Sequence, residues 1–383
     1  MHQNLLATSM KKRTRKTIGV PSMSKYYHDT KQCHKWLGIS AAIALLPNVA
    51  AAMAEPSPPK VASTQITKIA QNTETETTET SENTSDRESD VQTAQKSLEK
   101  GKKQNEQGQY REAIASLTAA LQKDPQLIDA YLYRGIAHFQ LGETQEAIAD
   151  FSQVLDKKPD SVRAYYHRGI AYATNQEYSQ ALDDYNQVLQ RDSKNAVTYV
   201  NRGTIHRRLG KNRAALEDYS QAIQINTNYA RAYNNRGVVR AEMGDLQGAL
   251  QDYDRALELK SDYARVYNNR GVVQARLGNF QRAIDDYTQA IGLNSQMTRA
   301  YVNRGAAWAQ IGEYQQAIDD YQQAIQLNPN DPVVYYNRGL VRANSGNEEG
   351  AIADFRQAAD LAWQQGNTQL YETALNNIEN LQR

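Results

Sequence analysis

A strict 34-residue period constrains this chain more than any other feature. The dipeptide Arg-Gly recurs at that interval, at Arg134-Gly135, Arg168-Gly169, Arg202-Gly203, Arg236-Gly237, Arg270-Gly271, Arg304-Gly305 and Arg338-Gly339. Gly101, preceded by Lys100, adds one more copy. Tandem copies with a period of about 20 to 50 residues are typical of solenoids, in which each repeat packs on its neighbours. The period therefore predicts one elongated array over most of the 383 residues.

The residues inside each repeat predict a helical hairpin. We number each repeat so that the Arg-Gly glycine is position 8. Position 4 is tyrosine in repeats 2 to 8, position 20 is always alanine, position 24 is aromatic in repeats 2 to 8, and position 27 is alanine or valine. Positions 4, 8 and 11 share one face of a helix A, and positions 20, 24 and 27 share one face of a helix B. Small residues at 8, 20 and 27 let the two backbones approach, and the aromatic residues fill the space beside them.

Turn residues predict where the helices end. Position 15 is glycine in seven repeats and Gln176 in repeat 3, and a left-handed cap at this point costs glycine little. Position 32 is occupied by Pro125, Pro159 and Pro329 in three repeats, and by Ser193, Thr227, Ser261 and Ser295 in four others. We expect the prolines to stop helix B, and the hydroxyl residues to serve as N-caps of the next helix A.

These positions resemble the tetratricopeptide repeat (TPR) family. The resemblance covers residues 94–365 through the period and the aromatic-Gly-Ala-aromatic-Ala-Pro pattern. It implies an all-α fold, a right-handed superhelical solenoid of antiparallel helix pairs, with A helices on the concave face. Repeat 1 is degenerate, with Ser97 and Gln104 at packing positions, as expected at an end of the array. We expect eight repeats over 91–365 and a capping helix over 366–383.

The N-terminal residues predict export. Residues 1–54 carry eight Lys or Arg and one Asp, an uncharged apolar run at Trp36–Leu46, and the small-residue site Ala52-Met53-Ala54. This is the pattern of a secretory signal peptide, which would place the protein in a periplasm, a lumen or at the cell surface. The alternative is an uncleaved membrane anchor over Trp36–Ala54. The only cysteine, Cys33, precedes the cleavage site, so the mature chain has no disulfide framework.

The segment after the predicted cleavage site reads as a disordered linker. Residues 55–90 are rich in Thr, Glu, Ser and Pro and contain no aromatic residue, so they cannot bury enough apolar surface to offset their ordering entropy. Everything after residue 54 holds 36 basic and 42 acidic residues, a balance that argues against a general nucleic-acid binder. The basic run Lys11–Lys16 could bind nucleic acid, but beside an apolar run it reads as the start of the signal, with Met10 or Met23 as alternative first residues.

Two further repeated positions predict an ion pair. Repeats 2 to 8 have arginine at position 7 and aspartate at position 23, whereas repeat 1 has Lys100 and Ser116 there. The co-occurrence suggests that the pair joins helix A to helix B, for example Arg270 to Asp286. An arginine left without its partner would destabilise the fold by several kcal/mol.

The predicted binding face of helix A comprises positions 2, 6, 9 and 13. Position 6 is Asn201, Asn235, Asn269, Asn303 and Asn337, and Asn234 and Asn268 lie beside two of them. They resemble the asparagine ladder with which some TPR superhelices hold an extended peptide by its backbone. An amide both donates and accepts, so it can satisfy a peptide group of any sequence, with about 0.5–1.5 kcal/mol for each bond. The alternative is that these asparagines only line a solvated surface.

Charged and apolar residues extend this face. The basic ones are Arg163, Arg231, Arg265 and Arg299 at position 2, with Arg207, Arg208 and Arg276 at positions 12 and 13. An apolar end near repeat 2 includes Tyr133 and Phe139, and only Asp129 and Glu242 oppose the basic charge. A basic groove would attract an acidic segment. Alternatively, the arginines pair with acidic residues of the neighbouring repeat.

Nothing in the sequence predicts catalysis. His138, His167 and His206 lie in three different repeats, and no zinc-ligand spacing, nucleophile elbow or phosphate loop occurs. We expect no metal, cofactor or enzyme activity, but an exported scaffold that binds a protein or an extended, partly acidic peptide. It would bind no nucleic acid, and would meet a membrane only through an uncleaved N-terminus. Two alternatives are a chaperone-like assembly or envelope factor that docks a folded partner, and a targeting or regulatory subunit of a separate enzyme.

Overall fold

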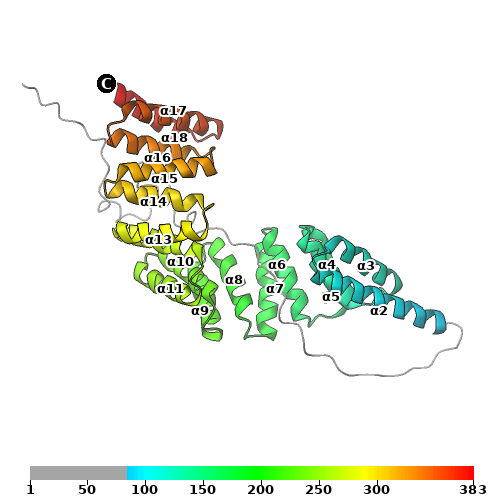
Figure 1. Ribbon diagram of the computed structural model, residues 1–383. Helices are drawn as coiled ribbons and strands as arrows, with labels where there is room; N and C mark the ends of the chain where they lie inside the picture. Colours follow the sequence, from blue (N-terminus) through cyan, green and yellow to red (C-terminus); the bar gives the residue numbers. More distant parts are fainter. Residues whose placement is uncertain (1–83) are drawn as a thin grey trace, which may run out of the picture. The chain divides into compact units, whose positions relative to one another are not determined.

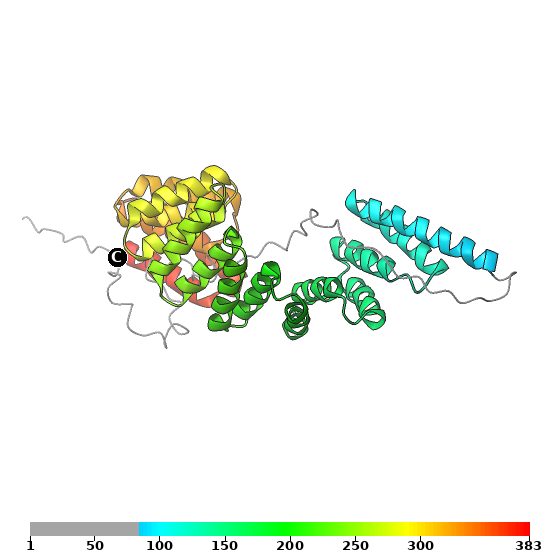
Figure 2. The same ribbon diagram turned by 90° about the horizontal axis from the view of Figure 1, so that it is seen from below.

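The computed structural model describes residues 84–383, and the predicted signal at 1–54 and most of the linker at 55–90 lie outside the described residues. All the secondary structure over 84–383 is helical, and consecutive helices form antiparallel pairs (Figures 1 and 2). The prediction of an all-α solenoid is confirmed. Over the same residues, no helix combines the length and apolar character needed to cross a bilayer.

Each repeat contributes one helix A and one helix B. The A helices are α2 (Thr84–Glu106), α4 (Ile128–Gln140), α6 (Val162–Thr174), α8 (Ala196–Arg208), α10 (Ala230–Glu242), α12 (Ala264–Arg276), α14 (Thr298–Gln310) and α16 (Pro332–Asn344). The B helices are α3 (Tyr110–Lys123), α5 (Thr144–Lys157), α7 (Tyr178–Arg191), α9 (Asn212–Ile225), α11 (Leu246–Leu259), α13 (Phe280–Leu293), α15 (Tyr314–Leu327) and α17 (Glu348–Gln364). The capping helix α18 (Thr368–Gln382) buries Leu370 and Ala374 against the last repeat and leaves Leu375 exposed.

The chain forms two compact units. The N-terminal unit holds α2 to α10, and the C-terminal unit begins at Gly244 and holds α11 to α18. In the N-terminal unit, α2 begins seven residues before the expected repeat boundary at 91, and Asp90 in this first part forms an ion pair of 2.9 Å with Lys123 of α3.

Close packing of each hairpin follows the repeated small and aromatic residues. Tyr287 of α13 is fully buried, and its ring lies over Gly271 of α12. A methyl group on Gly271 would come within 2.7 Å of the ring atom Cε1, so this position requires glycine. The aromatic side chains at position 24 of repeats 2 to 8 are all buried, as predicted.

The C-terminal ends of the A helices lie where the sequence predicts them, whereas their N-caps do not. The residues at position 15 have positive φ angles, and Gln176, with a φ of 63°, is the only non-glycine residue with positive φ over 84–383. The N-caps of the A helices, however, lie at position 34, where Ser161, Asn195 and Asp331 accept backbone N–H groups. The expectation that hydroxyl residues at position 32 are N-caps is therefore wrong, because helix A begins two residues later than it requires.

Candidate protein-binding surface

The predicted ion pairs between helix A and helix B are present. In Arg270–Asp286 the Nε and Nη2 groups donate to both carboxylate oxygens, the shortest bond being 2.6 Å. The same pair recurs at 2.6–2.9 Å as Arg134–Asp150, Arg168–Asp184, Arg202–Asp218, Arg304–Asp320 and Arg338–Asp354. Arg236 and Asp252 belong to different units, and their pair stays a prediction. Burial raises the pKa of Asp286, an effect that Arg270 opposes. Removing one partner of such a buried pair would leave an uncompensated charge, which is strongly destabilising.

Each arginine at position 7 also forms a hydrogen bond to the preceding repeat, a contact that the sequence did not predict. Its Nη1 group donates to a side-chain oxygen at position 25 of that repeat. The acceptors are Thr118, Ser152, Asn186, Ser220, Asp254, Thr288 and Gln322. Position 25 varies in residue type, and the only feature that repeats 1 to 7 share there is a side-chain oxygen. The tyrosine at position 4 lies under the guanidinium, 5.4–5.8 Å from ring centroid to Cζ.

The asparagines at position 6 are less accessible than the sequence suggested. Asn201 is 5% exposed, and Asn269, Asn303 and Asn337 are 0% exposed, while Asn235 is half-buried. Beside them, Asn234 and Asn268 are 3% and 1% exposed. The amides are therefore not an open row on the surface of the A helices, and their predicted hold on a peptide backbone stays a prediction.

Two of these amides bond to position 5 of the preceding repeat. Asn303 Nδ2 donates to Asn268 Oδ1 at 3.1 Å, and Asn201 Nδ2 donates to the Tyr166 hydroxyl at 3.5 Å. For Asn337, the residue at that place is Val302, which has no polar side-chain atom. Neither polar side-chain atom of Asn337 has a hydrogen-bond partner within the described part of the chain. The bonds of Asn303 and Asn201 therefore join neighbouring A helices to one another.

Two arginines at position 2 of the N-terminal unit, Arg163 and Arg231, have no carboxylate partner in the described part of the chain. Arg163 of α6 donates to the Tyr133 hydroxyl at 3.3 Å, and its guanidinium lies 4.8 Å from the centroid of that ring. Lys102 of α2 is 5.1 Å from the same centroid. Among residues 84–383, no carboxylate lies within ion-pair distance of Arg163 or of Arg231 in α10. Both guanidinium groups can therefore still bind an external anion.

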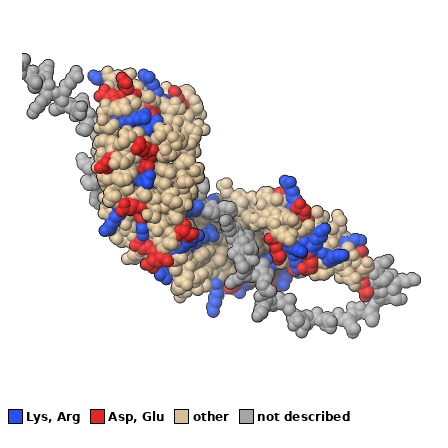
Figure 3. Space-filling model, in the orientation of Figure 1, with Lys and Arg blue, Asp and Glu red and all other residues tan. Residues whose placement is uncertain are grey.

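The other predicted residues have different surroundings. Arg207 forms a 2.8 Å ion pair with Glu242 of the next repeat, so pairing between neighbours holds for this arginine. Arg208 donates to the Tyr178 hydroxyl at 3.1 Å, and Phe139 packs beside Ile170 between α4 and α6. In the C-terminal unit, Arg265 and Arg276 lie on α12 and Arg299 lies on α14. Basic and acidic side chains lie close together along the visible face of this unit (Figure 3).

The histidines lie in different surroundings, and His167 acts as a packing residue. His167, at position 6 of repeat 3, stacks on Phe151 with centroids 5.6 Å apart and meets Tyr166 edge-on. Burial, together with the charge of Arg163, lowers the pKa of His167 to about 3, so this side chain is neutral near pH 7. His138 Nδ1 lies 2.6 Å from Glu143 Oε2. No group of three His, Cys, Asp or Glu side chains over 84–383 is arranged to hold a metal ion.

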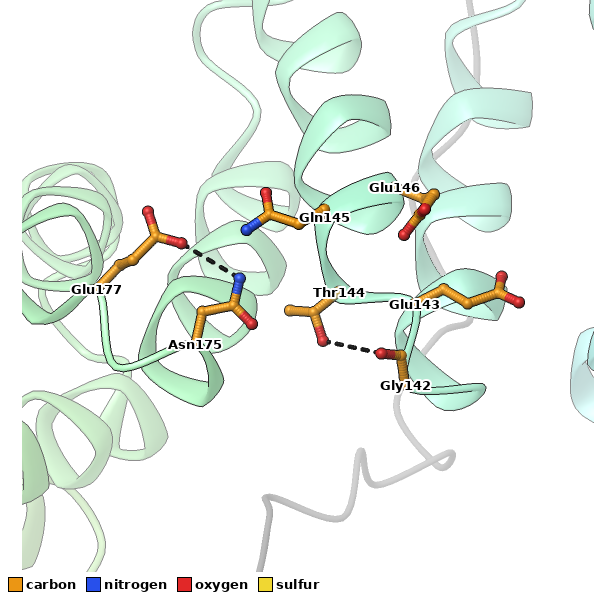
Figure 4. Close-up of a pocket in the computed structure, with 7 residues that line it drawn as sticks. All are labelled: Gly142, Glu143, Thr144, Gln145, Glu146, Asn175 and Glu177. Carbon is orange, nitrogen blue, oxygen red and sulfur yellow. Dashed lines mark hydrogen bonds between the residues drawn. The ribbon is translucent and has the colours of Figure 1, made fainter.

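A shallow open pocket of about 640 Å³ lies between the turns that join α4 to α5 and α6 to α7 (Figure 4). Gly142–Glu146, Asn175 and Glu177 line it. Asn175 Nδ2 donates to Glu177 Oε1 at 3.2 Å within it. Because it lies at the C-terminal ends of the A helices, it is separate from the arginines at position 2, and it contains no predicted site residue.

Family comparisons agree with the repeat geometry. Profiles described as tetratricopeptide repeat or TPR repeat match residues 98–196, 203–297 and 307–362. The chain belongs to the tetratricopeptide repeat family. A comparison with curated protein sequences gives no match.

Solved structures support the TPR fold. A tetratricopeptide repeat protein from Parabacteroides merdae matches with a TM-score of 0.54 at 20% identity, over 65% of this chain and 99% of that one. A chain of the APC/C hetero-tetramer Cut9–Hcn1 matches with a TM-score of 0.52 at 20% identity, over 70% of this chain and 52% of that one. At these identities the likeness concerns the fold. TPR arrays are protein-interaction scaffolds, and this chain is one.

Proposed function

We propose that the N-terminal unit of this TPR scaffold binds an extended acidic segment of a protein partner. The contact surface is formed by Tyr133, Arg163, Tyr166, Asn201 and Arg231 on α4, α6, α8 and α10, and we call it the inner face. We assign the chain no catalytic role.

Arg163 and Arg231, which contact no carboxylate among residues 84–383, support this proposal most directly. A guanidinium offers a planar fork of donors that matches a carboxylate, and such charged hydrogen bonds are stronger than neutral ones. Stacking on Tyr133 orients Arg163, so less rotamer entropy is lost when an anion binds. Arg231 acts on the same surface, because its charge opposes the rise in the pKa of Tyr166 that burial causes.

A second contact is proposed for the C-terminal unit, where an extended backbone would bond to the position 6 amides. Asn303 Oδ1 and both polar side-chain atoms of Asn337 have no partner in the described residues. A buried polar atom without a hydrogen bond costs about 1–3 kcal/mol, and a peptide group would remove that cost. Because both side chains are 0% exposed, α14 and α16 would have to separate slightly to admit it.

Binding of a labelled peptide of alternating Glu and Ser, measured by fluorescence anisotropy at low salt, tests the main proposal. Replacing Arg163 and Arg231 together with Gln should weaken binding at least about tenfold, since each lost charged bond is worth about 1.5–3 kcal/mol. Arg213→Gln, at an exposed position of α9, is the control and should leave the affinity unchanged. Equal binding by the double variant and the wild type, or equal binding of a Lys-Ser peptide, contradicts the proposal.

Export belongs to the same proposal. The basic start, the apolar run Trp36–Leu46 and the site Ala52-Met53-Ala54 support it. Cell fractionation with N-terminal sequencing should find a soluble chain that begins at Glu55. A membrane-bound chain with an intact N-terminus would indicate an anchor, and a cytosolic chain would contradict export.

A further inference from the structure

The last repeat carries tryptophan where the other repeats carry a turn residue. Position 32 is Pro, Ser or Thr in repeats 1 to 7 and is Trp363 in repeat 8. The helix B of each of repeats 1 to 7 ends at position 30, whereas α17 continues to Gln364, at position 33. This longer helix leads directly into α18 at the C-terminal end of the unit (Figure 1). The extra residues place Trp363 on the surface, where it is 63% exposed.

Trp363 belongs to a continuous apolar patch on α17 and α18. Its ring centroid lies 5.2 Å from that of Tyr371, and the two ring planes are tilted by 47°. Leu375 lies one turn after Tyr371 on the same face of α18 and is 42% exposed. We call Trp363, Tyr371 and Leu375 the end patch. Because most of the tryptophan lies outside its contact with Tyr371, closing the turn between α17 and α18 does not account for its exposure.

The packing pattern of the array does not explain the end patch either. In the register of the repeats, α18 follows α17 as a helix A, and a helix B packs on positions 4, 8 and 11 of its helix A. Gln369, Thr373 and Asn376 occupy these positions in α18. All three are polar and reach solvent. The side of α18 that a helix B would cover is therefore polar, and the exposed apolar residues lie elsewhere on the helix.

Acidic side chains surround the end patch. Asp360 lies one turn before Trp363 on α17, and Glu372 lies one turn before Leu375 on α18. Both carboxylates are exposed, and neither forms an ion pair within the described part of the chain, residues 84–383. Residues 357–382 contain no Lys or Arg. The local charge therefore attracts a cation and repels an acidic segment.

We infer that the end patch binds a basic segment of a protein partner that also carries apolar side chains. Trp and Tyr are the side chains that most often anchor protein interfaces, and the exposed face of an indole attracts Lys or Arg. Asp360 and Glu372 would pair with the same cations. A second copy of this chain fits less well, because a symmetric contact would bring the carboxylates of the two copies together. The inference goes beyond the proposed function, in which the inner face takes an acidic segment.

The test measures binding of a labelled peptide of repeating Lys-Leu-Ser to the full chain, by fluorescence anisotropy at low salt. Trp363→Gln should weaken binding at least about tenfold, because it removes the central aromatic anchor. Leu293→Gln, at a position of the same unit that is 44% exposed, is the control and should bind like the wild type. A peptide of repeating Lys-Ser-Ser should bind at least about tenfold more weakly than Lys-Leu-Ser, since it lacks the apolar contacts.

Charge variants test the acidic surroundings. Asp360→Asn combined with Glu372→Gln should weaken binding about three- to tenfold and make it less dependent on salt. Both positions are exposed, so this variant keeps the fold even if Trp363→Gln disturbs it. Asp285→Asn combined with Asp319→Asn, at exposed positions of α13 and α15, is the charge-matched control and should leave the affinity unchanged.

Several outcomes would overturn the inference. These are equal binding by the wild type and both end-patch variants, equal binding of a Glu-Leu-Ser peptide, or no binding of the basic peptide to the wild type. Self-association that Trp363→Gln abolishes would make a second copy the occupant. The variant with Arg163 and Arg231 changed to Gln should bind the basic peptide like the wild type, and a loss there would assign the peptide to the inner face instead.

Discussion

The N-terminal and C-terminal units share one construction and differ in what they place along their A helices. In both, the arginine at position 7 bonds to aspartate at 23 and to position 25 of the preceding repeat. At positions 5 and 6, the first repeats of the N-terminal unit have Tyr133, Tyr166 and His167, whereas the C-terminal unit has buried amides such as Asn303, a type that the N-terminal unit adopts only in its last repeats, as at Asn201. Positions 7, 8, 23 and 25 therefore build the array, and positions 2, 5 and 6 distinguish its parts.

The largest effect is expected where an arginine loses the only carboxylate that it contacts in the described part of the chain. Asp320→Ala leaves Arg304 with Thr288, a neutral acceptor, and should lower the free energy of unfolding by about 3–5 kcal/mol. Asp286→Ala should cost less, because Arg270 keeps Asp254 at 2.7 Å. Chemical denaturation of both variants measures this, with exposed Asp319→Ala as the control. Equal losses in the two variants would mean that the bond from Nη1 of the arginine to position 25 does not contribute to stability.

His167 should make the N-terminal unit sensitive to acid. Its pKa of about 3 in the fold lies below its ordinary value of 6.5, so the neutral form is favoured in the folded state. This stability is fully present above pH 6.5 and is lost as the pH falls, by about 1.4 kcal/mol per unit towards pH 3.

His167→Asn, which introduces the residue found at this position in later repeats, should flatten that part of the pH profile. Denaturation of wild type and variant between pH 7 and pH 4 gives the difference. Parallel profiles would show that His167 is protonated without penalty.

Buried asparagines should differ according to their partners. Asn303→Val removes the donor to Asn268 and should destabilise the C-terminal unit by about 1–3 kcal/mol. Asn337→Val removes an amide without partners in the described residues and should be neutral or stabilise by about 1 kcal/mol. Thermal unfolding of the two variants decides this, and a large loss in Asn337→Val would reveal a bond that the structure lacks.

The smallest effect concerns the turn of repeat 3. Gln176 has a φ of 63°, a conformation that costs residues other than glycine about 1 kcal/mol. Gln176→Gly should therefore stabilise the N-terminal unit by about 0.5–1 kcal/mol, and Gly210→Gln, the reverse change one repeat later, should destabilise it by a similar amount. Denaturant midpoints of both variants test the pair, and shifts of the same sign would contradict the explanation.

Most of the architecture was predictable because it repeats. The period placed every hairpin, and co-occurrence of arginine and aspartate in repeats 2 to 8 predicted pairs such as Arg304–Asp320. The bond from the arginine Nη1 group to position 25 could not be predicted, because its acceptors differ in residue type. Thr118, Asn186 and Asp254 have in common only that each has a side-chain oxygen. A side chain's role can be predicted from a repeat only when the same residue type recurs at the same position.

The binding face was predicted less well, since burial depends on how neighbouring A helices meet. Asparagine is common on solvated surfaces, and nothing in the sequence shows that Asn303 lies between α12 and α14. Likewise, the basic residues at positions 2, 12 and 13 look alike in the sequence. Only the structure shows that Arg207 has a carboxylate partner and that Arg163 has an aromatic one instead.

The variable residue at position 25 also bears on how the array yields to force. In a nearly one-dimensional array, each repeat is held mainly by its neighbours, so the weakest junction is the first to part. Asp254 gives Arg270 a charged link across its junction, whereas Ser152 and Thr288 offer only a hydroxyl. Under pulling from the two ends, the chain would part at the junctions with hydroxyl links before the one that carries Asp254. We therefore expect the residue at position 25 to influence the order in which the repeats separate under load.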